Sequence, residues 1–387
     1  DAGSAGFPLT REILAGYGEL LVPLVSPEQW FSGVRRLDIS LAARIENYSD
    51  FGTTTNPRLG ISYEPVDGIE VRGSLGTSFR APSFLDIRRG PGLDQVVPFR
   101  LVDPASPTGS TPVIALFGND PDIGPEKART WTIGVEATPH IIPGVSVRAT
   151  YFDVTYRDRI YNVAVDFQSM LTQRSRFETL ISDNPSAERV AALYADPYFT
   201  NPAGIEASAI RAIVDARNAN LARTAINGID FDVGYATGTP DRRIEVGFSG
   251  AYLFRIRQQL TEKAPPVDVV GTIGNAADLK LRARASANLG SLGAAAFVNH
   301  VGGYINNGVT PAERVDSWTT LDLQVWHVLG ARHGPLRNMR LSVAATNLLD
   351  EDPPYVNNRT PFSASGFDPE QASPIGRVIA LQLVKSW

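Results

Sequence analysis

The residue types that most often do chemistry in proteins are scattered along this chain of 387 residues rather than grouped. Its four histidines have no spacing typical of a metal site. The absence of cysteine excludes disulfides, thiolate zinc ligands and thiol catalysis. The segment Gly247-Phe248-Ser249-Gly250 falls one position short of a Gly-x-Ser-x-Gly nucleophile elbow. We therefore expect no catalytic residue, no metal site and no cofactor, and predict that the chain is not an enzyme.

Charged residues give two weaker signals. Asp230 and Asp232 would share one face of a strand, and paired carboxylates can serve general acid–base catalysis; a wet, polar strand face is the interpretation we favour. Arg88 and Arg89 are adjacent in a long segment, and neighbouring guanidinium groups suit an anionic ligand. The net charge of −5 gives no global basic field, so we expect no nucleic-acid partner.

Two-residue alternation of apolar and polar side chains recurs along the whole chain and predicts β-strands. Leu37, Ile39 and Leu41, for example, would lie on one face of a strand, with Asp38 and Ser40 on the other. The pattern predicts thirteen strands, at 10–22, 35–48, 55–65, 69–79, 126–138, 145–157, 223–238, 243–258, 275–289, 293–305, 316–329, 338–349 and 375–387.

The connections between these strands alternate between short and long, so all the long loops should emerge at one end of the sheet. The longest loops lie near 80–125 and 158–222. Helix signals within the second loop predict helices at 185–194 and 205–217, inside the loop rather than in a separate domain.

Two all-β classes fit alternation of this kind. A soluble sandwich also alternates, but many of the expected strands have 11–15 residues, whereas strands of soluble proteins usually have about five or six. No run of about 18 apolar residues predicts a membrane-spanning helix. We predict an antiparallel transmembrane β-barrel in meander order, with aromatic residues near the strand ends as interfacial girdles: Tyr48, Phe51, Tyr63, Phe79, Trp131, Tyr304, Trp318 and Trp387.

The end of the chain resembles the C-terminal signal by which the assembly machinery recognises outer-membrane barrels. Its last strand ends on an aromatic residue and places apolar side chains on one face. The residues of this resemblance are Gly376, Ile379, Leu381, Leu383 and Trp387.

Several further segments, in order along the whole chain, resemble the C-terminal part of a TonB-dependent receptor, a plugged transporter of the Gram-negative outer membrane. The most specific is Phe79-Arg80-Ala81-Pro82-Ser83. The others include Asn56-Pro57-Arg58-Leu59-Gly60, Pro125-Glu126-Lys127-Ala128 and Asn347-Leu348-Leu349-Asp350. The resemblance implies location in the cell outer membrane and active uptake of a scarce nutrient, such as a siderophore, cobalamin or an oligosaccharide.

The same resemblance implies partners and a missing part. Such receptors have about 22 strands around a plug, so we expect residues 1–387 to be a partial barrel, of thirteen C-terminal strands without the plug. The expected partners are outer-membrane lipid, a TonB complex acting through the plug, the barrel-assembly machinery and a small nutrient. The two longest loops should be extracellular and contribute Arg88, Arg89, Tyr198 or Phe199 to substrate contact. A passive porin-like channel and, less favoured, a barrel enzyme are the alternatives.

Overall fold

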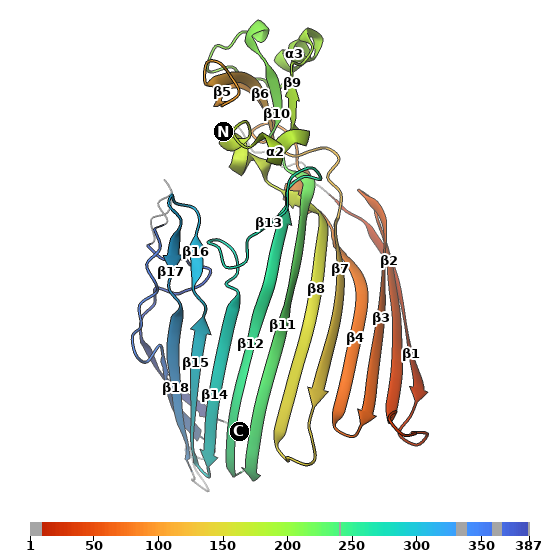
Figure 1. Ribbon diagram of the computed structural model, residues 1–387, viewed down its shortest axis with the longest axis vertical. Helices are drawn as coiled ribbons and strands as arrows, with labels where there is room; N and C mark the ends of the chain where they lie inside the picture. Colours follow the sequence, from red (N-terminus) through yellow and green to blue (C-terminus); the bar gives the residue numbers. More distant parts are fainter. Residues whose placement is uncertain (1–9, 240, 330–338, 358–365, 386–387) are drawn as a thin grey trace.

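The computed structural model describes residues 10–239, 241–329, 339–357 and 366–385. Its dominant feature is one large antiparallel sheet, which stands as a curved wall of long strands (Figure 1). Thirteen strands follow one another through the sheet in chain order: β1 (Ile13–Val25), β2 (Arg36–Tyr48), β3 (Gly52–Val66), β4 (Ile69–Arg80), β7 (Glu126–Ala137), β8 (Val145–Tyr161), β11 (Ala219–Thr239), β12 (Arg242–Gln259), β14 (Leu279–Leu289), β15 (Leu292–Val301), β18 (Trp318–Leu329), β19 (Met339–Thr346) and β20 (Val378–Lys385).

The predicted all-β meander of thirteen strands is therefore confirmed. A two-residue strand, β13 (Val267–Asp268), adds to the edge of β12. Within the described residues β1 and β20 are the two ends of the sheet, and each pairs with a single neighbour. Among the same residues, no helix is both long and apolar enough to pass through a bilayer.

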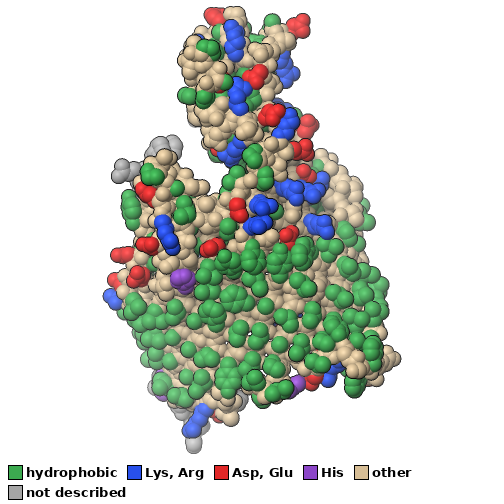
Figure 2. Space-filling model, viewed as in Figure 1, with side chains coloured by type: hydrophobic (Ala, Val, Ile, Leu, Met, Phe, Trp, Pro, Cys, Tyr) green, Lys and Arg blue, Asp and Glu red, His purple; other side chains and the backbone are tan. Residues whose placement is uncertain are grey.

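Each long strand has one apolar and one polar face, as period-two alternation requires. On the apolar face, large side chains such as Ile133, Val233 and Phe248 are exposed. Figure 2 shows hydrophobic side chains gathered in a broad band across the large sheet. An exposed apolar surface of this extent needs lipid or another apolar partner. The polar face carries residues such as Ser62 and Arg72.

The connections separate into two ends of the sheet, as expected. At the lower end in Figure 1 they are mostly tight, like the turn after β3, where Gly68 has a φ of +79° and a Cβ would lie 2.6 Å from the carbonyl oxygen of Thr138. At the upper end the two longest connections rise well above the sheet. We call residues 81–125 and 162–218 the head.

The head has its own small sheet, with the order β5-β6-β10-β9. Its strands are β5 (Gln95–Val102), β6 (Ser110–Phe117), β9 (Ile181–Asp183) and β10 (Ala212–Asp215), and β6 and β10 are parallel. Its helices are α1 (Phe84–Ile87), η1 (Val163–Ser169), α2 (Arg174–Phe177), η2 (Glu178–Leu180), α3 (Ala187–Tyr194) and η3 (Ala207–Ala209).

Two expectations about the head are corrected. The helix expected at 205–217 is a short η3 turn followed by β10, because Ala212, Ile213 and Val214 are buried on both faces of a sheet strand. Pairing was also expected only between consecutive strands, yet β6 pairs with β10 across the two loops. The helix expected at 185–194 is confirmed as α3, with Ser186 as its N-cap.

Most of the fully buried apolar side chains lie in the head rather than in the large sheet. One cluster, around Phe177, Met170 and Val113, fills one side of the small sheet, and a second, around Ile114 and Ile213, fills the other. The head is thus a layered unit with a hydrophobic core on each side of its sheet.

A smaller loop cluster covers the upper end of β14, β15 and β18. There β16 (Tyr304–Asn306) pairs with β17 (Glu313–Val315), and Tyr304 packs against Val315 and Val356. Tyr304 was expected to be an interfacial girdle residue, but it is only 7% exposed. Burial, with a contribution from Asp368, raises the pKa of its phenol well above the usual range.

Candidate functional site

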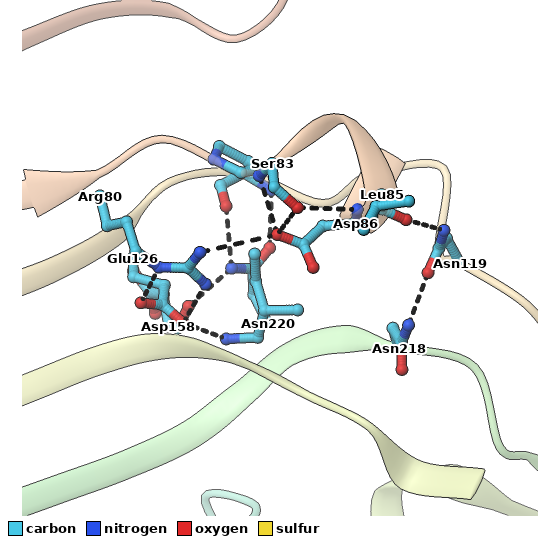
Figure 3. A network of polar contacts seen from close by, with 12 residues as sticks. Arg80, Ser83, Leu85, Asp86, Asn119, Glu126, Asp158, Asn218 and Asn220 are labelled. Atoms are coloured by element: carbon cyan, nitrogen blue, oxygen red, sulfur yellow. Dashed lines mark hydrogen bonds and ion pairs between the residues drawn. The ribbon is translucent and has the colours of Figure 1, made fainter. Parts of the chain in front are cut away.

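The candidate site is built on the junction between the large sheet and the head, which we call the neck (Figure 3). At its centre Arg80, the last residue of β4, faces Glu126, the first residue of β7. Arg80 Nε donates to Glu126 Oε2 at 2.7 Å and Arg80 Nη2 donates to Oε1 at 2.9 Å. Oε1 also accepts from the backbone nitrogen of Ile160 at 2.9 Å. A two-point ion pair therefore joins β4 to β7 where the head begins, and the backbone hydrogen bond from Ile160 adds β8 to the same carboxylate.

The chain turns from β4 into α1 through a capping box. Ser83 Oγ accepts from the Asp86 backbone nitrogen at 3.3 Å, and Asp86 Oδ2 accepts from the Ser83 backbone nitrogen at 2.8 Å. Arg11, just before β1, donates to the carbonyl oxygen of Pro82 at 2.8 Å. The Phe79–Ser83 segment thus has a structural role, which is to end the strand and start the helix.

Three asparagines tie the two loops of the head together at the neck. Asn119 Nδ2 donates to the carbonyl oxygens of Leu85 at 2.8 Å and Arg88 at 2.7 Å. Asn218 Nδ2 donates to Asn119 Oδ1 at 2.6 Å, across 99 positions of sequence.

Asn220 makes the densest of these contacts. Its Oδ1 accepts from the backbone nitrogen of Gly124 at 2.6 Å, and its Nδ2 donates to the carbonyl oxygens of Gly124 at 3.0 Å and Asp158 at 2.6 Å. Sequence reasoning missed all three asparagines. The only local signal was their position at loop ends, where amides commonly bond the backbone.

An ion-pair network centred on the buried carboxylate Asp103 links the end of β5 to α2 and β9. Asp103 is 3% exposed and accepts from Thr111 Oγ1 at 2.6 Å and from Arg174 Nη2 at 3.1 Å. Burial acts to raise the pKa of this carboxyl, but these hydrogen bonds, with one from the Ala105 backbone, outweigh burial and hold the pKa below its usual value. Arg174 also contacts Asp183 at 3.0 Å. The head is therefore braced by charge as well as by its cores.

The predicted contact residues Arg88 and Arg89 lie beside the neck and are exposed. Arg89 Nε is 3.3 Å from Asp94 Oδ2, so its charge is partly compensated. The Arg88 side chain has no ion pair within the described part of the chain. Arg88 is thus the more available of the two for an anionic ligand.

The predicted contact residues Tyr198 and Phe199 lie elsewhere in the head and are half-buried. The Phe199 ring lies against that of Tyr194, with centroids 4.4 Å apart and planes tilted by 36°, and packs against the second core. The carbonyl oxygen of Tyr198 accepts from the Val96 backbone nitrogen at 3.2 Å. Over the described residues, no contact joins this pair to Arg88 or Arg89, so the structure does not bring the four residues together.

The predicted assembly signal lies on β20 at the edge of the sheet. Ile379, Leu381 and Leu383 are 68%, 73% and 59% exposed and share one face. Gly376 precedes the strand, where a Cβ would lie 2.6 Å from Asp350 Oδ1. Trp387 lies outside the described residues.

The polar face of the large sheet forms a hydrogen-bonding wall below the head. Arg148 Nη2 donates to Glu136 Oε1 at 3.0 Å, and Arg72 pairs with the same carboxylate. Farther along, Arg284 Nη1 donates to Asp232 Oδ2 at 2.8 Å. A hollow of about 700 Å³ on this face is lined mostly by such polar and charged side chains. Asp232 therefore belongs to the polar wall and is paired with a cation there.

The described residues contain no group of three or more histidine, cysteine, aspartate or glutamate side chains placed to hold a metal ion. The arrangement offers instead a folded head, a charged neck and a polar wall.

Comparison with known proteins agrees with this architecture. The family model described as "TonB dependent receptor-like, beta-barrel" matches residues 6–348. No curated protein sequence matches the chain.

Among solved structures, the siderophore receptor PirA from Acinetobacter baumannii superimposes with a TM-score of 0.60 at 15% identity, covering 96% of this chain and 45% of that one. A ferric enterobactin receptor (PfeA) variant from Pseudomonas aeruginosa, in complex with enterobactin, gives 0.60 at 14% identity, with 96% and 45% covered. The FrpB iron transporter from Neisseria meningitidis gives 0.53 at 12% identity, with 96% and 45% covered. The chain thus spans less than half the length of these structures and shares their fold. It belongs to the TonB-dependent receptor β-barrel family.

Proposed function

We propose that this chain forms part of the wall and an extracellular head of an outer-membrane importer for a scarce small nutrient. The observation that carries the proposal is the pairing of an exposed apolar band on one face of the sheet with a charged wall on the other, below a folded head. Lipid would contact the first face and hydrated cargo the second. The family to which the chain belongs consists of transport receptors, which favours uptake over catalysis.

The family and the names of the matched structures support the cargo and partners that we propose. Their names, siderophore receptor and ferric enterobactin receptor, make a ferric chelate the first cargo to test. A TonB complex acting through a plug would supply energy, and the barrel-assembly machinery would recognise β20. Arg88, Arg89, Tyr198 and Phe199 are the proposed cargo contacts. Arg88 is the first to substitute, because its side chain forms no ion pair with any residue that the structure describes.

Uptake of a radiolabelled ferric chelate tests this function in cells that lack other receptors and carry the outer-membrane protein containing this chain. Uptake should require TonB, and R88Q should raise the half-saturating concentration about tenfold, since a charge-assisted hydrogen bond is worth about 1.5–3 kcal/mol. R189Q, an equal charge change on exposed α3, is the matched control. Uptake that continues at full rate without TonB would favour the passive channel instead.

A further inference from the structure

The apolar face of β7 changes character in a fixed order along the strand. On β7 the side chains of this face are, from the upper end downward, Lys127, Arg129, Trp131, Ile133 and Val135. They run from cation to aromatic to aliphatic. On β8, β11 and β12, the next strands of the sheet, this face also carries arginine near the upper end: Arg157 on β8, Arg223 on β11, and Arg255 with Arg257 on β12.

The cations at the upper end of these strands form one continuous surface. Lys127 pairs in register with Arg157, and Asn227 on β11 pairs with Arg255. We call this surface the cationic patch, which consists of Lys127, Arg129, Arg157, Arg223, Arg255 and Arg257, all exposed. Figure 2 shows Lys and Arg side chains gathered directly above the hydrophobic band.

The patch is not neutralised by the protein itself. Lys127 Nζ lies 3.2 Å from Asp158 Oδ2, whereas the five arginines have no ion pair within the described residues. Three other carboxylates stand near the patch: Asp153, Glu262 and Asp268. The last of these accepts hydrogen bonds from the backbone nitrogens of Ile256 and Val270. Six cations against four carboxylates on one surface leave positive charge for an external anion.

A row of aromatic rings directly below the patch marks where an apolar medium would end. Trp131 and Tyr151 have ring centroids 5.0 Å apart, Tyr151 and Phe254 6.2 Å, and Tyr252 and Phe254 5.4 Å. Aromatic rows of this kind sit at the level of lipid head groups. The cationic patch would then lie at the depth of the head-group phosphates.

A recess within the patch offers a specific seat for such a group. It measures about 350 Å³ and is lined by Arg157, Arg223, Gln259 and Thr261, and also by two carboxylates, Asp158 and Glu262, of which Asp158 pairs with Lys127. Two guanidinium groups with amide and hydroxyl neighbours suit a phosphate carried on a polyhydroxylated head group.

We infer that the cationic patch binds the phosphates of an outer-leaflet glycolipid and thereby fixes the depth of the receptor in the membrane. The inference rests on the proposed outer-membrane placement, but not on the cargo or on TonB. It assigns these residues to lipid rather than to nutrient, because they lie on the face opposite the polar wall.

Native mass spectrometry of the purified full receptor with added diphosphorylated lipid A tests the inference. R157Q/R223Q should weaken lipid A binding about 30-fold, since each basic side chain near an anionic lipid surface is worth about fivefold. R255Q/R257Q, confined to β12, should weaken lipid A binding by a similar factor. This second variant keeps the inference testable if R157Q/R223Q fails to fold. R189Q/R242Q is the control, with the same loss of charge on α3 and at the lower end of β12.

Three further arms decide the outcome. Dephosphorylated lipid A should bind as weakly to the wild type as lipid A binds to the patch variants. Inorganic phosphate should not displace the lipid; equal displacement would overturn the inference in favour of a free-anion site. Unchanged lipid binding in both patch variants would also overturn it. Nutrient uptake by the wild-type receptor is measured in parallel. A wild type that binds lipid A but takes up no ferric chelate would contradict the proposed function and leave the lipid site standing.

Discussion

At the scale of single residues, amide side chains give the neck its cohesion. Asn119, Asn218 and Asn220 each bond main-chain or amide groups that belong to the other loop or to the end of a long strand. Because these groups are fixed by short, directional contacts, removal of one partner leaves donors and acceptors unsatisfied. The head should therefore respond to small substitutions far from any cargo.

We expect N220A to loosen the neck. The substitution removes three hydrogen bonds, and the local free energy of opening should fall by about 1–3 kcal/mol. Hydrogen exchange in segments 119–124 and 158–162 should become faster. N47A removes a single exposed hydrogen bond to Thr53 and is the control, with exchange at the neck unchanged. Equal protection of the neck in both variants would contradict the role given to Asn220.

Acid should weaken the head through Asp103. The folded pKa of this carboxyl lies below its unfolded value, so its stabilising contribution is full above the unfolded pKa, about 3.9, and is lost as pH falls through the folded pKa. Protease nicking of the head should therefore increase below about pH 4 in the wild type. D103N should nick faster already at pH 7 and show a weaker dependence on acid. The same acid dependence in D103N and the wild type would assign the effect to other groups.

At the scale of elements, bulges and close approaches shape the long strands. The pairing of β11 with β12 shifts register between Asn227 and Gly228, directly below the cationic patch. A Cβ on Gly228 would lie 2.6 Å from the carbonyl oxygen of Tyr252 and 3.0 Å from Cζ of Phe152. The close approach of β11 to its neighbours β8 and β12 at this point thus depends on a residue without a side chain.

G228A should therefore destabilise the sheet by about 1–3 kcal/mol through overpacking. G16A on β1, where a Cβ meets nothing within 4 Å, should be neutral or stabilising by about 0.5–1 kcal/mol. The temperature at which detergent-extracted receptor loses its heat-modifiable gel band compares the two. A lower temperature for G16A than for G228A would refute the packing argument.

At the scale of the whole molecule, the two ends of the sheet have different structures. Folded loops lie at the end where the head stands, and mostly tight turns lie at the other. With the proposed function, the head faces the outside of the cell and the turns face the periplasm.

Single cysteines can test this sidedness, because residues 1–387 contain none. Glu188 is exposed on α3, and Ile141, 94% exposed, lies in the turn between β7 and β8 at the opposite end. A membrane-impermeant thiol reagent should label E188C on intact cells and I141C only after the outer membrane is disrupted. The reverse pattern would invert the topology and remove the head from any role in cargo capture.

The sequence by itself determined the strands and their order. Alternation such as that of Leu37, Ile39 and Leu41 is local, and consecutive antiparallel strands pair with their neighbours in the chain, so period and loop length are enough to predict the meander and its two ends. The capped helix at α3 was predictable for the same local reason.

Only the tertiary structure decided how the loops fold and which side chains meet. The parallel pairing of β6 with β10 and the contact of Asn119 with Asn218 join segments about a hundred positions apart, and that pairing made Ala212–Asp215 a strand where a helix was expected. Tyr304 was removed from the expected girdle by loop packing, and the cationic patch was assembled by register across four strands. No local period encodes such contacts, because they depend on which distant surfaces are brought together when the chain folds.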